Sequence, residues 1–205
     1  MIDTIVFDMG GVLLDFGSHL FADRLHLSED DRILLEQNLM RTVDWVRLDR
    51  GTITEEGAVR AVCERLPETL HTCVREVVTR WHARTLEPME GMADLLRELK
   101  EKGMHIYLLS NANQKLRSYF PRIPGSECFD GLMVSAEERL LKPQHEIFEA
   151  LLYRFDLKAE ECFFVDDVPA NVEGAAEAGL SGTVFYGDVP RLRRELRKAG
   201  IPVEA

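Results

Sequence analysis

Cysteine is scarce in this sequence: the 205 residues contain four, and no two of them form a Cys-x-x-Cys pair. Pairs with that spacing hold structural zinc or carry the two thiols of a redox motif. The six histidines likewise lack the His-x-x-x-His and His-x-His spacings of many metal sites. We therefore expect neither a zinc site nor a redox site, and we interpret the cysteines as reduced, buried thiols of a cytoplasmic protein.

Long apolar runs and an excess of basic residues are also missing. No stretch approaches the roughly 20 apolar residues that span a bilayer, and the first residues carry no basic region of a targeting signal. The 25 basic and 36 acidic side chains give a formal net charge of -11, which repels nucleic acids and anionic membranes. We expect no nucleic acid and no membrane as a partner, and a monomer or a small homo-oligomer.

Five short apolar runs are present instead, each too short for a helix and with little polar alternation. Such runs are typical of strands that are buried on both faces of a parallel sheet. We predict strands at residues 5–7, 106–109, 132–134, 162–165 and 183–186. We predict helices between and after them at residues 92–102, 114–120, 144–155, 170–178 and 190–199. This alternation predicts an α/β fold with a Rossmann-like doubly wound parallel sheet.

The alternation is interrupted between residues 16 and 86, where no convincing strand pattern occurs. Amphipathic helical patterns there cover residues 18–25, 29–40, 55–66 and 70–85. Thr54 directly precedes the third pattern, and Glu55 and Glu56 are the first residues of that pattern. This arrangement favours a helix start. We therefore predict a Rossmann-like core from residues 1–15 and 87–205, with an inserted α-helical cap from residues 16–86.

Polar residues follow three of the predicted strands directly. Asp8 follows the first, Ser110 and Asn111 follow the second, and Asp166 and Asp167 follow the fourth. The carboxyl ends of parallel strands meet at one edge of a sheet, so we expect these residues to converge. Taken singly, an Asp or a Ser-Asn pair after a strand is more often a turn or a helix start. Two adjacent carboxylates repel each other unless a cation is near, so the acidic pair favours a metal site.

Together with Lys142, and in this order, these residues resemble the four motifs of the haloacid dehalogenase-like hydrolase superfamily. The motifs are Val6-Phe7-Asp8-Met9-Gly10-Gly11-Val12-Leu13, Leu108-Leu109-Ser110-Asn111, Lys142-Pro143, and Val165-Asp166-Asp167-Val168-Pro169-Ala170-Asn171-Val172. The resemblance covers essentially the whole chain, including a small helical cap between motifs one and two. It implies a phosphatase, a phosphoric monoester hydrolase, that acts on a small phosphorylated metabolite. Motif one is closest to members regarded as sugar 1-phosphate phosphatases.

The resemblance also implies Mg²⁺ as the cofactor. Asp8, Asp167 and the carbonyl of Gly10 would hold the ion, Asp166 would bind it directly or through water, and Asn171 would position the acidic loop. The charge of a phosphate ester repels nucleophiles, so the site has to neutralise that charge before attack.

The catalytic and phosphate-binding residues follow from the same resemblance. Asp8 would attack phosphorus to form an aspartyl-phosphate, which water hydrolyses in a second step. Lys142 and the hydroxyl of Ser110 would bind the phosphate as further catalytic residues. The backbone N–H groups around Met9 and Asn111 would donate additional hydrogen bonds to it.

Gly10 departs from the family pattern, because most phosphatases of the family have an Asp there that protonates the leaving group. Loss of a general acid-base group typically costs about 10² to 10⁴ in rate. Three functions stay open: a phosphatase whose substrate has an easily expelled leaving group or that recruits another proton donor, a catalytically weak phospho-ligand-binding or regulatory module, and a 2-haloacid dehalogenase. The acidic pair of motif four argues against the last, since dehalogenases do not need it.

The cap of such enzymes closes over the site and contacts the leaving group, so we expect it to determine substrate choice. Arg41, Trp45 and Arg47 are candidates for that contact, although a solvated surface explains each of them more simply. Asp15 lies at the expected hinge into the cap. We interpret it as a capping or hinge residue, with proton donation as the alternative.

Overall fold

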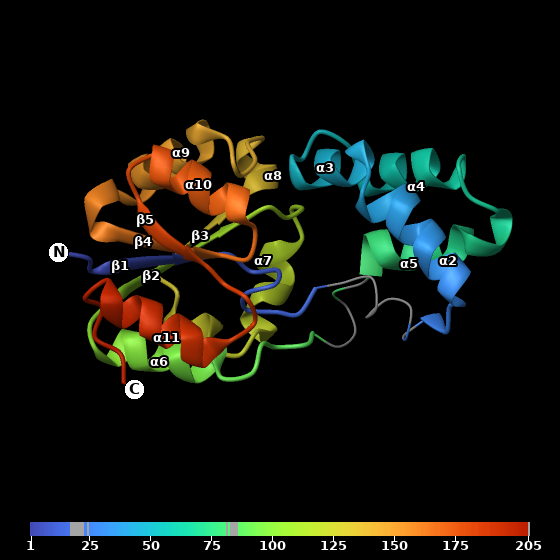
Figure 1. Ribbon diagram of the computed structural model, residues 1–205. Coiled ribbons are helices and arrows are strands. Elements are labelled where there is room, and N and C mark those ends of the chain that lie inside the picture. Colours follow the sequence, from blue (N-terminus) through green and yellow to red (C-terminus); the bar gives the residue numbers. More distant parts are fainter. Residues whose placement is uncertain (17–22, 24, 81, 83–85, 205) are drawn as a thin grey trace.

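The apolar runs form one parallel sheet in the computed structural model, which describes residues 1–16, 23, 25–80, 82 and 86–204. The strands are β1 (Thr4–Phe7), β2 (His105–Ser110), β3 (Gly131–Val134), β4 (Cys162–Asp166) and β5 (Ser181–Val184). Their order is β3-β2-β1-β4-β5, and every neighbouring pair is parallel (Figure 1). The predicted fold class, a doubly wound parallel sheet with an inserted helical part, is confirmed.

Helices cover both faces of this sheet. α6 (Met92–Glu101) and α11 (Val189–Lys198) lie on one face, and α9 (His145–Phe155) and α10 (Pro169–Glu177) lie on the other (Figure 1). Shorter segments are α7 (Leu116–Tyr119), α8 (Ser135–Glu138) and 3₁₀ turns at Phe120–Arg122, Ser126–Cys128 and Ala159–Glu161. α8 was not predicted. No helix in the described part of the chain is long and apolar enough to cross a membrane.

The central strand β1 is buried on both faces because successive side chains of a strand point to opposite sides. Ile5 and Phe7 belong to the apolar cluster that includes Leu95 of α6. Val6 belongs to the cluster that includes Phe148 of α9. This burial holds the end of β1 in a fixed position at the carboxyl edge of the sheet.

The edge strand β5 begins at Ser181, two residues before the strand predicted from the sequence. Ser181 pairs with Phe163 of β4, and Gly182 passes so close to β4 that a Cβ there would lie 2.7 Å from the carbonyl oxygen of Phe164. Tyr186, the last residue of the predicted strand, is exposed. The predicted bounds were wrong. Pairing with β4 determines where β5 begins and ends, whereas the prediction was based on the apolar residues.

Between β1 and α6 the described residues form helices, which we call the cap. They are α2 (Glu29–Leu35), a π-helical segment at Glu36–Met40, α3 (Val43–Asp49), α4 (Glu55–Cys63), a 3₁₀ turn at Glu68–Leu70 and α5 (His71–Arg80). They enclose an apolar core of their own. The predicted start of α4 is confirmed, since Thr54 Oγ1 accepts a hydrogen bond from the N–H of Gly57 at 3.1 Å. The predicted helices at 18–25 and 70–85 fall partly outside the described residues, at 18–22, 24, 81 and 83–85.

The helix α3 was not predicted, because it lacks an apolar stripe. Val43 and Val46 are exposed, while Asp44 is buried beside Leu48. The Asp44 carboxylate lies 2.7 Å from Nη2 of Arg65, so an ion pair occupies part of the face that turns to the cap interior.

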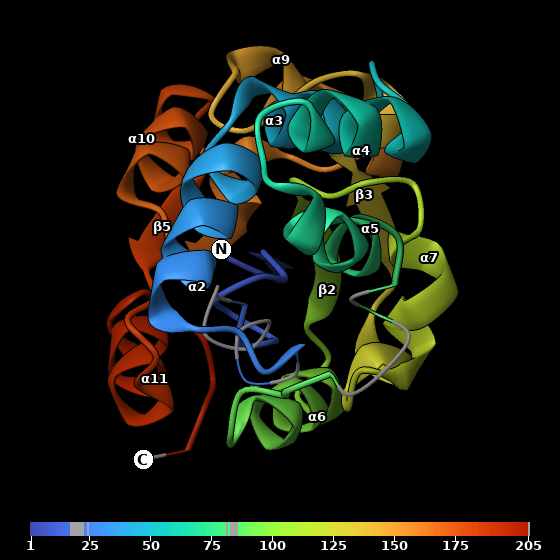
Figure 2. The ribbon, with the colours of Figure 1, turned by 90° about the vertical axis from the view of Figure 1, so that its right-hand side faces the viewer.

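The cap lies beyond the carboxyl ends of the strands, and its helices stand in front of the sheet when seen from that side (Figures 1 and 2). The end of α3 docks on α8. The hydroxyl of Ser135 donates to the carbonyl of Asp49 at 2.5 Å. Gly51 passes so close to Ala136 that a Cβ there would lie 2.3 Å from the Ala136 carbonyl oxygen.

We expect Gly51→Ala to lower the free energy of unfolding by roughly 2 to 4 kcal/mol, since the alanine has to adopt a positive φ and also meets the Ala136 carbonyl. The φ of Gly51 is 68°. Gly103→Ala is a matched control, because Gly103 has a φ of 81° but no atom within 4 Å of the added Cβ. This control should cost about 1 kcal/mol. Urea denaturation measures both, and equal losses would contradict the tight docking of the cap.

Candidate active site

Asp8 stands at the end of β1, where its backbone N–H still donates to the carbonyl of Val165 in β4 at 2.9 Å. The next residues turn back sharply: the N–H of Leu14 donates to the carbonyl of Met9 at 3.0 Å, and Gly11 has a φ of 74°. Strand pairing and this turn therefore hold the Asp8 carboxylate at the sheet edge, where the residue is 8% exposed.

Lys142, in the loop before α9, is buried, and its Nζ contacts three oxygens. These are Oδ1 of Asp8 at 2.8 Å, Oδ2 of Asp166 at 2.6 Å and the carbonyl of Leu109 at 2.8 Å. The side chain of Asn111 holds the loop, because it accepts from the Lys142 N–H at 2.9 Å and donates to the Lys142 carbonyl at 3.0 Å. The Asn111 side chain thus positions Lys142, a role that was not predicted.

Asp166 is completely buried, and both of its carboxylate oxygens are occupied. Oδ1 accepts from the N–H of Val168 at 2.8 Å and from Asn171 Nδ2 at 3.0 Å. Oδ2 accepts from Lys142 Nζ at 2.6 Å and from Asn171 Nδ2 at 3.1 Å. A carboxylate has about four lone-pair sites, and these contacts use them. This arrangement favours Asp166 as the residue that orients Lys142 over direct metal binding.

The carboxylates outnumber the lysine in this site. Burial raises the pKa of Asp8 to about 6; the charge of Lys142 opposes this rise and that of Asp166 adds to it. Burial alone would lower the pKa of Lys142, but the charges of Asp8 and Asp166 outweigh it and raise that pKa. With Asp167 alongside, three carboxylates face one ammonium group. This surplus of negative charge favours a bound cation.

The same carboxylates fit a magnesium ion. Ligand oxygens of Asp8, Asp166 and Asp167 lie within 4.8 Å of one another. Asp167 packs directly against Gly11, where an added Cβ would lie 2.3 Å from its Oδ2, so the absence of a side chain there leaves room for the carboxylate. Mg²⁺ prefers charged oxygen ligands of this kind. Asp8 and Asp167 are the better placed of the three, since the oxygens of Asp166 are already occupied.

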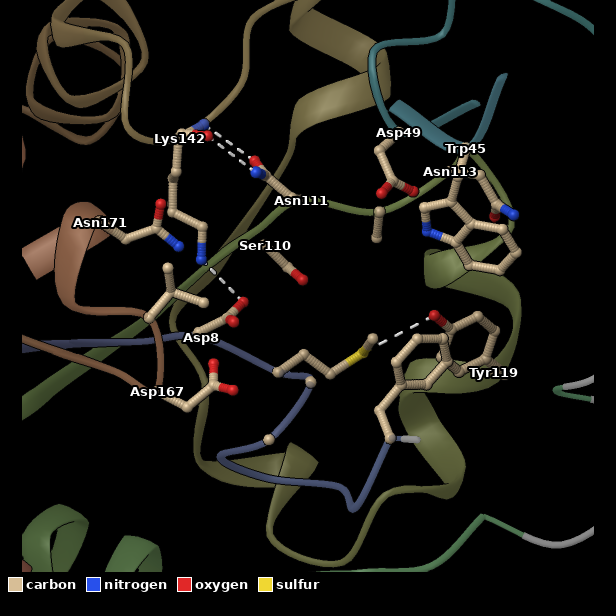
Figure 3. Close-up of a pocket in the computed structure, with 16 residues that line it drawn as sticks. Asp8, Trp45, Asp49, Ser110, Asn111, Asn113, Tyr119, Lys142, Asp167 and Asn171 are labelled. Carbon is tan, nitrogen blue, oxygen red and sulfur yellow. Dashed lines mark hydrogen bonds and ion pairs between the residues drawn. The ribbon is translucent and has the colours of Figure 1, made fainter. Parts of the chain in front are cut away.

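A cavity of about 240 Å³ lies at the carboxyl edge of the sheet, and Asp8 and Asp167 are among the residues that line it (Figure 3). Seven of the eight predicted site residues line it: Asp8, Met9, Gly10, Ser110, Asn111, Lys142 and Asp167. Ser110 is the last residue of β2 and is 1% exposed. The eighth, Asp166, is buried beside Lys142 and does not line the cavity.

Of the candidates outside the motifs, Trp45 lines the cavity, whereas Arg41, Arg47 and Asp15 are not among the described residues that do so. Arg41 is exposed and lies 2.5 Å from Oε1 of Glu36. Arg47 is exposed and pairs with a carboxylate of its own helix. Asp15 is exposed as well. This geometry gives no support to proton donation by Asp15.

Three polar residues of the cavity were missed in the sequence: Asp49, Asn113 and Tyr119. Asp49 ends α3, a helix that the sequence pattern did not reveal. Tyr119 ends α7, and its hydroxyl lies 3.7 Å from the sulfur of Met9. Asn113 lies three residues after Ser110, and this closeness to the second motif is the one signal that the sequence offers for it.

Comparisons with known proteins identify the family to which the chain belongs. A family model for haloacid dehalogenase-like hydrolases matches residues 2–179. The sesquiterpene phosphatase astK of Aspergillus oryzae is 29% identical over 185 residues, which cover 86% of this chain and 86% of that protein. The D-ribitol-5-phosphate phosphatase of Bacteroides thetaiotaomicron is 26% identical over 190 residues, which cover 88% of this chain and 90% of that protein.

The fold is also found among solved structures. A haloacid dehalogenase family enzyme from Bacteroides thetaiotaomicron, in complex with magnesium and inorganic phosphate, aligns with a TM-score of 0.70 and 24% identity. The alignment covers 94% of this chain and 99% of that one. Since the family model spans most of the sequence and the four motifs meet at one sheet edge, the chain belongs to the haloacid dehalogenase-like hydrolases.

Proposed function

We propose that this protein is a Mg²⁺-dependent phosphohydrolase that cleaves a small phosphate ester through an aspartyl-phosphate on Asp8. The observation that carries the proposal is the position of the Asp8 carboxylate, which faces the cavity between Lys142 and Asp167 (Figure 3). A nucleophile reaches a charged phosphoryl group only where nearby cations neutralise that charge. Lys142 supplies one such cation, and the carboxylate pair formed by Asp8 and Asp167 fits a second.

In the proposed first step, Asp8 attacks phosphorus and the leaving group departs on the opposite side. Lys142 and the Ser110 hydroxyl bind phosphate oxygens, and the N–H groups of Met9 and Asn111 are further donors. Water then hydrolyses the aspartyl-phosphate and regenerates the carboxylate.

The magnesium ion belongs to the same proposal. Asp8, Asp167 and the carbonyl of Gly10 would hold it, and when bound it supplies positive charge that offsets the charge of the phosphoryl oxygens. Asp166 keeps Lys142 in place beside it.

The proposed substrate is a small phosphorylated metabolite, such as a sugar phosphate. A cavity of about 240 Å³ accommodates a small molecule. The two relatives are named as a D-ribitol-5-phosphate phosphatase and a sesquiterpene phosphatase, which supports a phosphate ester as the substrate class. Gly10 offers no side chain that protonates a leaving group, so the substrate either has an easily expelled leaving group, as in a sugar 1-phosphate, or receives its proton from another residue of the site.

The test is a panel of phosphate esters, including sugar phosphates, alkyl phosphates and p-nitrophenyl phosphate, assayed with Mg²⁺ and after its removal with EDTA. We expect removal to lower turnover by about 10²-fold or more, because several kcal/mol of charge stabilisation is lost. Added MgCl₂ should restore it.

Three results would contradict the proposal. Turnover that is unchanged by EDTA would exclude the metal. Hydrolysis of no ester, with phosphorylated ligands raising the melting temperature, would favour a binding module. Metal-independent halide release from a 2-haloacid would instead indicate a dehalogenase.

A further inference from the structure

The cavity contains a carboxylate that the proposed roles leave unused. Asp49, the last residue of α3, lines it together with Asp8 and Lys142. Figure 3 shows the Asp49 side chain beside Trp45, on the cap wall of the cavity, with Asp8 on the core side. The carboxylates of Asp8 and Asp167, which also line the cavity, serve as nucleophile and metal ligand in the proposed reaction.

The position of Asp49 matches the place of the leaving group. The attacking and leaving oxygens of a phosphoryl transfer stand roughly in line, on opposite sides of phosphorus. Asp8 attacks from the sheet edge, so the leaving oxygen points toward the opposite wall, which the cap provides. Gly10, beside the nucleophile, has no side chain for this oxygen.

The backbone of Asp49 is fixed to the core. Ser135 Oγ donates to the Asp49 carbonyl at 2.5 Å and accepts from the N–H of Ala112, in the loop after β2, at 2.9 Å. The close approach of Gly51 to Ala136 holds the next turn of chain in the same place. Asp49 is therefore held over the cavity by contacts with the core as well as by the cap.

The surroundings of Asp49 favour its protonated form. Burial and the negative charge of Asp8 raise its pKa well above the ordinary value, while a hydrogen bond from Trp45 and the charge of Lys142 oppose this rise. A carboxyl group whose pKa is raised toward neutrality is suited to donate a proton. Tyr119 is less suited, because burial raises its pKa and so strengthens its hold on the proton.

We propose that Asp49 is the acid-base residue of this site, in place of a side chain at Gly10; the assignment rests on the phosphohydrolase function proposed above. As an oxygen of Asp8 bonds to phosphorus, the bond from phosphorus to the leaving oxygen breaks, its electron pair stays on that oxygen, and the oxygen takes the proton of Asp49. Asp49 is then a carboxylate. It takes a proton from the water whose oxygen attacks phosphorus, and the bond between Asp8 and phosphorus breaks to release phosphate.

Asp49→Asn tests this assignment, because the amide keeps the shape of the side chain and removes its acid. We expect the turnover of the best alkyl phosphate of the panel to fall by about 10² to 10⁴. With p-nitrophenyl phosphate the leaving phenolate needs no proton, so the first turnover should keep its rate. This first turnover should appear as a burst of about one product molecule per enzyme. Slow turnover should follow, because the hydrolysis of the aspartyl-phosphate lacks the Asp49 carboxylate as its base.

The controls separate this proposal from the proposed function. Glu56→Gln removes an exposed carboxylate elsewhere in the cap and should change neither reaction. Asp49→Glu keeps a carboxyl group and should retain part of the alkyl phosphate turnover, and the melting temperatures of all variants check that they fold.

Several outcomes would overturn the role of Asp49. These are equal slowing of the first turnover with both esters, unchanged turnover of the alkyl phosphate by Asp49→Asn, or an Asp49→Glu variant as slow as Asp49→Asn. If the wild type hydrolyses neither ester, both proposals fail. If Asp8→Asn abolishes turnover while Asp49→Asn is harmless, this one alone fails.

Discussion

Asp8→Asn is expected to lower the turnover of every phosphate ester by about 10⁴-fold or more, since the variant removes the proposed nucleophile on which both proposed steps depend. An amide oxygen is a poor nucleophile toward phosphorus, and a neutral side chain is also a weaker ligand for Mg²⁺. The substitution changes the shape of the side chain little. Steady-state kinetics measures the loss, and acid-quenched enzyme should show labelled phosphate on the wild type but not on the variant.

Asp15→Asn is the matched control for this prediction. Asp15 follows Asp8 by seven residues, is exposed, and is not among the described residues that line the cavity. Its substitution should leave turnover within a few-fold of the wild type. Turnover that survives Asp8→Asn, or a loss in Asp15→Asn as large as that in Asp8→Asn, would refute the assignment of the nucleophile.

Lys142→Met is expected to lower the free energy of unfolding by about 3 to 5 kcal/mol, because it leaves the buried carboxylates of Asp8 and Asp166 without their cation. The side chains of Lys142 and Asp166 are 0% exposed, so water cannot replace the lost contacts. Methionine fills a similar volume, which keeps a cavity from adding to the effect. The same variant should also lose ester turnover, because the phosphate loses a positive charge.

Lys158→Met shows what an ordinary ion pair contributes. Lys158 lies 3.2 Å from Glu161, but its side chain is 67% exposed. Its loss should cost no more than about 1 kcal/mol. Denaturation in urea compares the two variants. If Lys142→Met and Lys158→Met unfold at the same urea concentration, burial adds nothing to the contribution of the Lys142 ion pairs.

The strands were predictable because burial on both faces of a sheet produces continuous apolar sequence. β1 and β4 illustrate this, since every one of their residues is buried. α3 and β5 lack that signal. The buried face of α3 includes Asp44, which is stabilised by Arg65, and the register of β5 depends on its contact with β4. Both features depend on tertiary partners that no local pattern reveals.

The candidate site likewise contains residues that the sequence predicts and residues whose positions depend on tertiary contacts. Asp8, Ser110 and Asp167 each follow a strand or end it, so the topology of a parallel sheet brings them together. Asp49 belongs to a different case, because the docking of α3 on α8 through Ser135 decides where it lies. The role of Asp166 also depends on contacts with Lys142 and Asn171 that spacing does not show.

The central place of β1 has a consequence for how the chain folds. Thr4 pairs with His105 on one side and with Cys162 on the other, so β1 is synthesised long before either neighbour. Contacts between such distant segments form slowly, and an apolar strand without partners is prone to aggregate. The segment that bears Asp8 therefore leaves the ribosome before both strands that hold it. A chain that ends before β4 would present Asp8 on an unpaired edge.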